Sequence, residues 1–252
     1  MDDEEFETVR SLWRSATSCP SGFARPGWVV APSDGHRAAP EGWVGVIELR
    51  GSVVVATPAK LAERLSLMLE RASVVSDLTD PITATRIFGP FRRSLGPAVL
   101  LYGRVDQAAL ATSVVIGPLA IDDVRVVEVI SQASDHEVEE SGLADTTSGV
   151  FVAVDAAGHP VGACGWRRWP HGIAHMSALT AAGHRGHGFG RAAAIAALAA
   201  AERDRLLPQW RALTTNGASI ALGTSLGMVP TGRQLSVLLD TAAERTPERH
   251  LN

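Results

Sequence analysis

One stretch of this chain has the composition of an anion-binding turn: Leu179-Thr-Ala-Ala-Gly-His-Arg-Gly-His-Gly-Phe-Gly-Arg191. It follows a strand-like run at 173–180 and leads into an alanine-rich segment at 192–201. A strand, a glycine-rich turn and a helix start bring free backbone N–H groups and the positive end of the helix dipole to one point. Arg185 and Arg191 add cationic donors. The stretch therefore predicts a phosphate site, with a glycine turn that holds no ligand as the alternative.

The spacing of the glycines separates the known phosphate motifs. A Walker loop needs Lys and then Ser or Thr where this chain has Phe189 and Gly190. A dinucleotide-binding fingerprint needs a third glycine where this chain has Arg191. The spacing that fits is R-x-x-G-x-G, formed by Arg185, Gly188 and Gly190.

This R-x-x-G-x-G segment resembles the pyrophosphate loop of the GNAT superfamily of acyl-CoA-dependent N-acyltransferases, where the loop joins the fourth strand to the third helix. A second segment agrees: Asn216-x-x-Ser219 followed by Leu226-Gly227 is similar to the N-x-x-A/S and L-G segment at the family's fourth helix. The resemblance extends over residues 121–240, about half of the chain. A short region between the expected first and second strands further resembles the two-domain, FR47-like branch.

The resemblance implies where the cosubstrate acetyl-CoA would lie. In the family, acyl-CoA occupies the wedge where the fourth strand separates from the fifth, and a free N–H near Leu179 would stabilise the oxyanion. The backbone at 178–180 would bond the pantetheine arm, and the amides of the loop would hold the pyrophosphate. The cofactor contacts implied are Ala178, Leu179, Thr180, Arg185, Gly186, His187, Gly188, Phe189, Gly190, Arg191, Asn216 and Ser219.

The carboxylate that commonly serves as the general base in the family is missing from this chain. The carboxylate that many members carry on the fourth strand falls at Ala174. The neighbouring His175 has an unperturbed pKa of about 6.5, which suits deprotonation of an ammonium group. Strand alternation puts His175 on the opposite face from Ala174 unless a bulge intervenes. His175 is therefore the candidate base or water relay, and a structural, hydrogen-bonded histidine is the alternative.

The general acid of the family is also missing. The tyrosine that commonly protonates the leaving thiolate falls at Gly223, and the only tyrosine, Tyr102, lies in the other half of the chain. Three alternatives stay open: Ser219 or a water as the acid, Tyr102 reaching the thioester, or no acid at all. The last is chemically reasonable because a free thiol with a pKa of about 8.5 can leave as a thiolate.

Composition excludes several function classes. A net charge of −4 gives no reason to expect nucleic acid or an anionic membrane as a partner. Cys19 and Cys164 allow at most one disulfide, and Cys164 is expected to be a packed core thiol. His184 and His187 have no Cys or carboxylate at ligand spacing, so no metal is expected.

Localisation follows from the start of the chain and from its apolar runs. The start is acidic, and no apolar run reaches the roughly 20 residues of a membrane span. The expected localisation is cytoplasmic. A single lysine, Lys60, with abundant alanine suggests the coding bias of a GC-rich, bacterial source.

Periodicity and breakers predict an α/β (α+β mixed) chain. Helices are expected at 2–16, 57–71 (capped by Thr57), 81–87, 134–142 (opened by a Ser134 to Glu137 capping box), 189–205 and 218–226. Strands are expected at 28–30, 43–49, 53–56, 98–102, 124–130, 150–154, 161–166, 173–180, 210–213 and 235–239.

The fold expected by resemblance is a GNAT fold, a central and mostly antiparallel mixed sheet flanked by helices, preceded by a smaller α/β domain. The divisions expected are 1–118, which completes an acceptor pocket or is a degenerate GNAT-like copy; 119–240, the acetyltransferase domain; and 241–252, a frayed tail.

The function implied is transfer of an acetyl group from acetyl-CoA directly to a small-molecule primary amine in a ternary complex. The alternative is a non-catalytic CoA-binding or interaction module with a degenerate active site, which the missing carboxylate and tyrosine favour. The sequence does not name the acceptor amine or the oligomeric state, and a homodimer is compatible with it.

Overall fold

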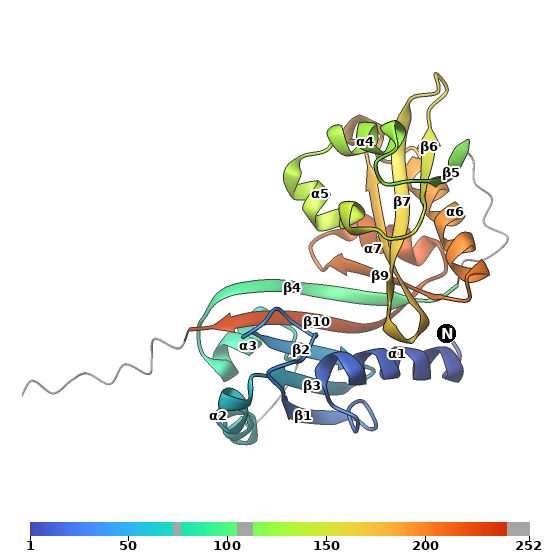
Figure 1. The fold of residues 1–252 in the computed structure, drawn as a ribbon. Coiled ribbons are helices and arrows are strands. Elements are labelled where there is room, and N and C mark those ends of the chain that lie inside the picture. The colour runs from blue at the N-terminus through green and yellow to red at the C-terminus, as the bar shows by residue number, and fades with distance from the viewer. Residues whose placement is uncertain (73–76, 105–112, 241–252) are drawn as a thin grey trace, which may run out of the picture. The chain divides into compact units, whose positions relative to one another are not determined.

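The computed structural model describes residues 1–72, 77–104 and 113–240, and its contacts divide the chain into two units. Unit 1 comprises Met1–Leu12 and Val99–Thr231, and unit 2 comprises Trp13–Ala98 and the residues from Gly232 onward. The chain passes from one unit to the other within α1 (Asp3–Thr17), β4 (Phe91–Tyr102) and β10 (Val229–Leu239) (Figure 1). Among the described residues, no helix is long and apolar enough to span a membrane.

Unit 2 contains a sheet with the order β1-β3-β2-β10. Its strands are β1 (Gly27–Pro32), β2 (Val44–Leu49), β3 (Ser52–Thr57) and the part of β10 from Gly232 onward. The β2–β3 hairpin turns at Arg50 and Gly51, whose φ values of 48° and 82° give the turn the twist that a two-residue hairpin needs. Helices α2 (Ala59–Arg71) and α3 (Pro81–Phe88) bury leucines and Phe88 against this sheet.

Unit 1 contains the sheet on which the candidate site is built, with the strand order β9-β8-β7-β6-β5. Its strands are β5 (Val115–Leu119), β6 (Val150–Val154), β7 (Pro160–Trp169), β8 (Ile173–Thr180) and β9 (Leu207–Leu213). Neighbours from β5 to β8 are antiparallel, whereas β8 and β9 are parallel. This is the mixed, mostly antiparallel sheet expected for the GNAT fold.

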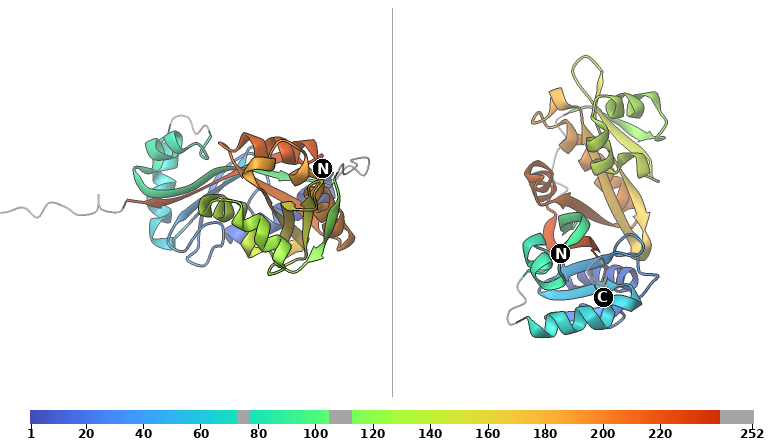
Figure 2. Two further views of the ribbon diagram at one scale, coloured as in Figure 1. Left: turned by 90° about the horizontal axis from the view of Figure 1, so that it is seen from above. Right: turned by 90° about the vertical axis from the view of Figure 1, so that its left-hand side faces the viewer.

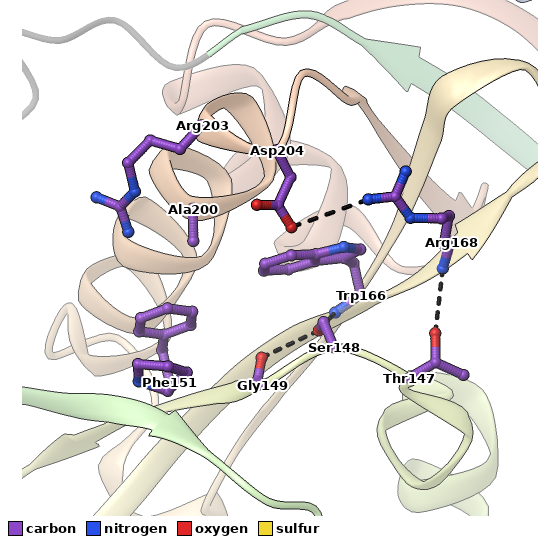
Figure 3. A pocket seen from close by; sticks show the side chains of 10 residues that line it. Thr147, Ser148, Gly149, Phe151, Trp166, Arg168, Ala200, Arg203 and Asp204 are labelled. Atoms are coloured by element: carbon purple, nitrogen blue, oxygen red, sulfur yellow. Dashed lines mark hydrogen bonds and ion pairs between the residues drawn. The ribbon is translucent and has the colours of Figure 1, made fainter.

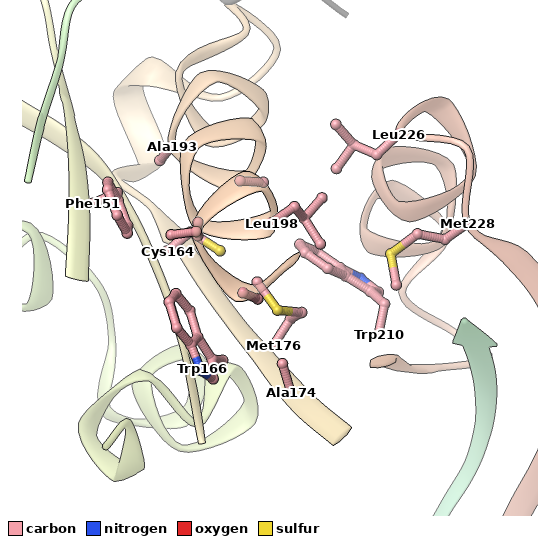
Figure 4. Packing of buried hydrophobic residues seen from close by; sticks show 14 of the residues in the cluster. Phe151, Cys164, Trp166, Ala174, Met176, Ala193, Leu198, Trp210, Leu226 and Met228 are labelled. Atoms are coloured by element: carbon pink, nitrogen blue, oxygen red, sulfur yellow. The ribbon is translucent and has the colours of Figure 1, made fainter. Parts of the chain in front are cut away.

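Helices cover both faces of the unit 1 sheet. Helix α6 (Phe189–Arg203) lies on one face, and α4 (Val124–Ser131) and α5 (Asp135–Ser141) lie on the other (Figures 1 and 2). Because α6 buries mostly alanine and glycine, its backbone can approach the strands closely. Figure 4 shows Leu198 of α6 beside Trp210 of β9, near Met176 of β8. Helix α7 (Gly217–Ser225) follows β9.

Most predicted elements are confirmed, and several strands are longer than expected, β4 and β10 most of all. The capping box at Ser134 and Glu137 is present, and Gly142 ends α5 in the left-handed conformation, as predicted. Strands β4 and β10 begin at Phe91 and Val229, earlier than the apolar runs that predicted them. The expected tail at 241–252 lies outside the described residues.

The strand expected at 124–130 is wrong, because this segment is helix α4. Its β-branched residues suggested a strand, but the Asp123 side chain accepts a hydrogen bond from the N–H of Arg125 at 3.0 Å and caps a helix. Val126 and Val129, three residues apart, are both buried. The first strand of this sheet is instead β5, so residues 120–149 with two helices separate it from β6. The FR47-like placement, which rested on a short region after a strand at 124–130, stays a prediction.

Two smaller expectations also change. Thr57 is the last residue of β3, and the N-cap of α2 is Pro58, which makes no side-chain cap. Asp34 instead accepts a hydrogen bond from the N–H of Ala59 at 2.9 Å. The division expected near residue 118 falls inside β5, whose ladder with β6 keeps Gly117 and Pro118 within unit 1.

Candidate active site

The parallel strands β8 and β9 of unit 1 separate at His175. The β8–β9 ladder contains three residue pairs and ends with His175 opposite Gln209. Strand β8 continues to Thr180, paired with β7 along its whole length. Within the described residues, no strand pairs with the β9-facing edge of β8 from Met176 onward. This open edge contains Ala178, Leu179 and Thr180 and can form backbone hydrogen bonds with an extended ligand.

The glycine loop lies at the end of this open edge. Gly186 and Gly188 have φ values of 76° and 86°, a region that favours glycine, and Gly188 is the N-cap of α6. The first helical bond is donated by Ala192 to the Gly188 carbonyl at 2.9 Å, so the amides from Phe189 to Arg191 precede the helical ladder. These amides and the helix dipole favour an anion.

Gly190 fixes the distance between the loop and the strand. A Cβ built on Gly190 would lie 2.5 Å from the Thr180 hydroxyl oxygen, so only glycine allows α6 to begin directly against the end of β8. The predicted pantetheine and pyrophosphate contacts are thereby brought together at one end of α6.

Arg185 is held by two partners beside the loop. Its Nε donates to the Thr180 carbonyl at 3.2 Å, and its guanidinium pairs with Glu137 of α5 at 2.6 Å. The backbone N–H of Ser134 and then the Arg185 guanidinium lower the pKa of Glu137 to about 2. His187 is exposed, and its Nδ1 lies 2.8 Å from the Arg185 carbonyl oxygen.

Asn216 and Ser219, expected to contact the cofactor, have structural partners. The Asn216 side chain accepts a hydrogen bond from the N–H of Ser219 at 3.0 Å and caps α7, and its amide donates to Glu140 of α5 at 2.8 Å. The Ser219 hydroxyl accepts a hydrogen bond from the indole of Trp210 at 3.0 Å. The motif thus orients the start of α7, and its contact with a cofactor stays a prediction.

His175 lies on the face of β8 opposite Ala174. The β7–β8 register is unbroken, so the strand has no bulge on that side, and Ala174 is buried in the core against α6. The His175 ring stacks on Trp169 with centroids 4.3 Å apart, and its Nδ1 lies 2.8 Å from the Gln209 side-chain oxygen.

The pKa of His175 is far from the value assumed from sequence. Burial lowers it to about 4, with smaller contributions from nearby Arg211 and Arg167, and the hydrogen bond with Gln209 opposes this shift. The imidazole is therefore neutral at physiological pH and does not titrate between pH 6 and 8.

Gln209 is the residue of this site that sequence reasoning missed. It is fully buried, and its amide also donates a hydrogen bond to the hydroxyl of Tyr102, which is buried too. Tyr102 is therefore linked to His175 through Gln209, although the two residues lie 73 positions apart in the sequence. The link depends on which residue of β9 lies opposite His175, and sequence alone does not give that register.

Position 223, Cys164 and possible metal ligands were the other candidates for a catalytic role. A Cβ on Gly223 would lie 3.2 Å from the Trp210 ring, so a side chain there would require Trp210 to shift. Cys164 is buried, and burial raises the pKa of its thiol. The described residues contain no group of three or more His, Cys, Asp or Glu side chains placed to hold a metal ion.

A cavity of about 510 Å³ lies away from the glycine loop, at the C-terminal end of α6. Figure 3 shows Phe151 and Trp166 at its floor, with Arg203, Asp204 and Arg168 around it. Arg168 and Asp204 approach to 4.0 Å. Ala200 and Arg203 of its lining follow Phe189 by 11 and 14 residues, which is about 16–21 Å along α6, so the cavity is separate from the candidate site.

An open strand edge that ends on a glycine loop at a helix start is suited to an extended, phosphate-bearing ligand. Residues 121–228 match the model of the acetyltransferase (GNAT) family, and this segment belongs to that family. Acyl transfer is accordingly the general class of reaction for this domain. No curated protein sequence matches the chain significantly.

Several solved structures are similar to this chain at low identity. A GNAT-family acetyltransferase from Colwellia psychrerythraea is 12% identical over 73% of this chain and 75% of that one, with a TM-score of 0.47. A tandem GNAT protein from the clavulanic acid biosynthesis pathway is 15% identical over 93% and 95%, with a TM-score of 0.46. A GCN5-related N-acetyltransferase-like protein from Streptococcus suis is 14% identical over 92% and 99%, with a TM-score of 0.43. The family assignment rests on the family model and not on these likenesses.

Proposed function

We propose that this protein transfers an acetyl group from acetyl-CoA directly to a primary amine of a small molecule. The observation that supports the proposal best is the open edge of β8, which ends on the R-x-x-G-x-G loop at the start of α6. The pyrophosphate of acetyl-CoA would bind the loop amides and Arg185, and its pantetheine arm would follow residues 178–180. These contacts are non-covalent, so both substrates can be present together.

The reaction needs no enzyme nucleophile. The amine attacks the thioester carbon, and the negative charge that develops on the carbonyl oxygen is stabilised by an N–H near Leu179. The bond to sulfur then breaks, and CoA leaves as a thiolate that takes a proton from solvent. This step requires no tyrosine, in agreement with the glycine at position 223.

The proton of the attacking nitrogen goes to His175 or to a water bound to it. A base with a pKa of about 4 is too weak to deprotonate a free ammonium ion, so the amine must attack in its neutral form. The nitrogen becomes much more acidic once it bonds to the carbonyl carbon, and a weak base can then accept its proton. The rate should therefore rise with pH as the acceptor amine loses its proton.

The competing proposal is a CoA-binding module without transferase activity, which Ala174 and Gly223 favour because neither position carries the family's catalytic side chain. Release of free CoA from acetyl-CoA in the presence of a panel of primary amines separates the two. Amine-dependent release supports the transferase. Binding of acetyl-CoA without release, for every amine of the panel, supports the module.

Binding itself is tested at the glycine loop. Gly188→Glu should abolish acetyl-CoA binding in calorimetry, because a side chain at the N-cap blocks the amides and adds a negative charge. Gly35→Glu is the matched control, since it adds the same charge where a Cβ meets no atom within 4 Å. A circular dichroism melt shows whether each variant is folded. Unchanged affinity in folded Gly188→Glu would contradict the proposed binding site.

A further inference from the structure

Three polar side chains form a continuous buried chain beside the point where β8 and β9 separate. The Nδ1 of His175 on β8 lies 2.8 Å from the side-chain carbonyl oxygen of Gln209, and Gln209 of β9 donates from its amide nitrogen to the hydroxyl of Tyr102 of β4. Gln209 and Tyr102 are fully buried, and His175 is partly buried. All three belong to unit 1.

Both ends of the Gln209 amide are used inside the protein. A buried amide group without a partner is destabilising, so rotation of this side chain away from either partner is unfavourable. Stacking on Trp169 at an interplanar angle of 12° also restrains the His175 ring. One nitrogen of the imidazole is thus committed to Gln209. Among the described residues, the other nitrogen, Nε2, has no hydrogen-bond partner.

We propose that Gln209 is a positioning residue that holds His175 in its Nδ1–H tautomer and so leaves Nε2 as the proton acceptor for the attacking amine. This inference rests on the proposed acetyl transfer, and it adds a residue that no family motif marks. A neutral imidazole accepts a proton only at the nitrogen that carries no hydrogen. The opposite tautomer would place an N–H where the amine needs a lone pair.

The positive charges around His175 disfavour its protonated form, so His175 passes a proton on and does not keep it. Arg167 of β7 and Arg211 of β9 are the charged groups that act on the ring, and both disfavour the imidazolium form. Tyr102 is linked to the ring through Gln209 and carries no charge as a phenol. A proton taken up at Nε2 therefore passes on to solvent quickly, and the imidazole returns to the neutral tautomer.

The tautomer can be measured without activity. Long-range ¹H–¹⁵N correlation spectra of the wild-type protein at pH 7 should show His175 with a protonated Nδ1 and an unprotonated Nε2. His175→Gln identifies the resonances by their loss. A protonated Nε2 in the wild-type protein, or a mixture of tautomers, would overturn the inference.

Two substitutions of Gln209 separate positioning from simple support of the fold. Gln209→Met has a similar length but accepts no strong hydrogen bond, so the tautomers should mix and kcat should fall by about tenfold or more, while KM for acetyl-CoA changes by less than about twofold. Gln209→Glu keeps the acceptor, adds a charge and should raise the pKa of His175, which introduces a break in the pH–rate profile near neutral pH.

The matched control is Gln132→Met, since Gln132 donates to the carbonyl oxygens of Glu128 and Pro160 outside the site. It should leave the tautomer and kcat unchanged. If Gln209→Met is too unstable to assay, the wild-type spectrum and Gln209→Glu still decide the inference. If the expected tautomer is found but no amine is acetylated, the proposed function fails: Gln209 then fixes the tautomer of His175, and the role of Nε2 as proton acceptor is overturned together with the function.

Discussion

Replacement of Glu137 by Gln should tighten the binding of CoA. Arg185 is a proposed partner of the pyrophosphate, but it pairs with Glu137 at 2.6 Å. A bound pyrophosphate must share or replace this partner, and the carboxylate repels the incoming phosphates. Glu137→Gln removes the charge and keeps the capping box, because glutamine serves as well at this position of a helix.

The size of the effect follows from exposure. The Arg185 and Glu137 side chains are 48% and 31% exposed, so solvent screens their ion pair and its loss has a small effect. The dissociation constant for CoA should fall by a factor of about 1.4 to 5. Because the pKa of Glu137 is about 2, the carboxylate stays ionised from pH 5 to pH 8, and the effect should not vary over that range.

The assay is calorimetric titration with CoA at low salt and at about 0.5 M salt, where screening should reduce the difference between the proteins. Glu139→Gln is the control, since it removes the same charge from an exposed position of the same helix. Equal affinities for the Glu137→Gln and Glu139→Gln proteins, or weaker binding by the former, would refute the competition for Arg185.

Three further outcomes are expected. Because the pKa of His175 is low, the unfolded chain binds more protons than the folded chain between about pH 6.5 and 4. The free energy of unfolding should therefore be at its full value above pH 6.5 and fall by up to about 3 kcal/mol as the pH falls through 4. Denaturant unfolding of His175→Gln should show a smaller loss. Gly190→Ala should destabilise the protein by about 1–3 kcal/mol through its contact with Thr180, and Thr180→Ala in the same chain should recover part of this loss in a thermal melt. A fragment starting at residue 118 should not fold, because the cut passes through β5 and removes Leu101 from the core; a cooperative melt of that fragment would contradict this.

Local signals of the chain predicted most elements and the glycine loop. Gly188 adopts a positive φ, and Gly190 lies where α6 approaches β8 closely. Both situations favour glycine, so both residues are visible in the sequence. The capping box at Ser134 was visible for the same reason, since its partners are three residues apart. Such features depend on neighbours in sequence, and sequence reasoning therefore recovers them.

Features that depend on pairing between distant strands were not predicted. The segment at 124–130 was assigned as a strand from its valines, whereas the cap at Asp123 and the packing of Val126 and Val129 make it a helix. The Gln209 link is set by the register of β9 against β8, and the pKa of His175 is set by burial in the folded chain. Neither quantity is encoded in a local pattern.

The order in which the strands of unit 2 are synthesised restricts how this chain can fold. The sheet of unit 2 pairs β2 with β10, and Leu49 lies opposite Gly232 near the other end of the sequence. A nascent chain cannot complete this sheet until β10 has left the ribosome, so β2 has an unpaired edge until then. Contacts of such long sequence separation slow folding, and an exposed apolar edge invites association with other chains. Production of this protein should therefore depend more strongly on temperature and on chaperones than its small size suggests.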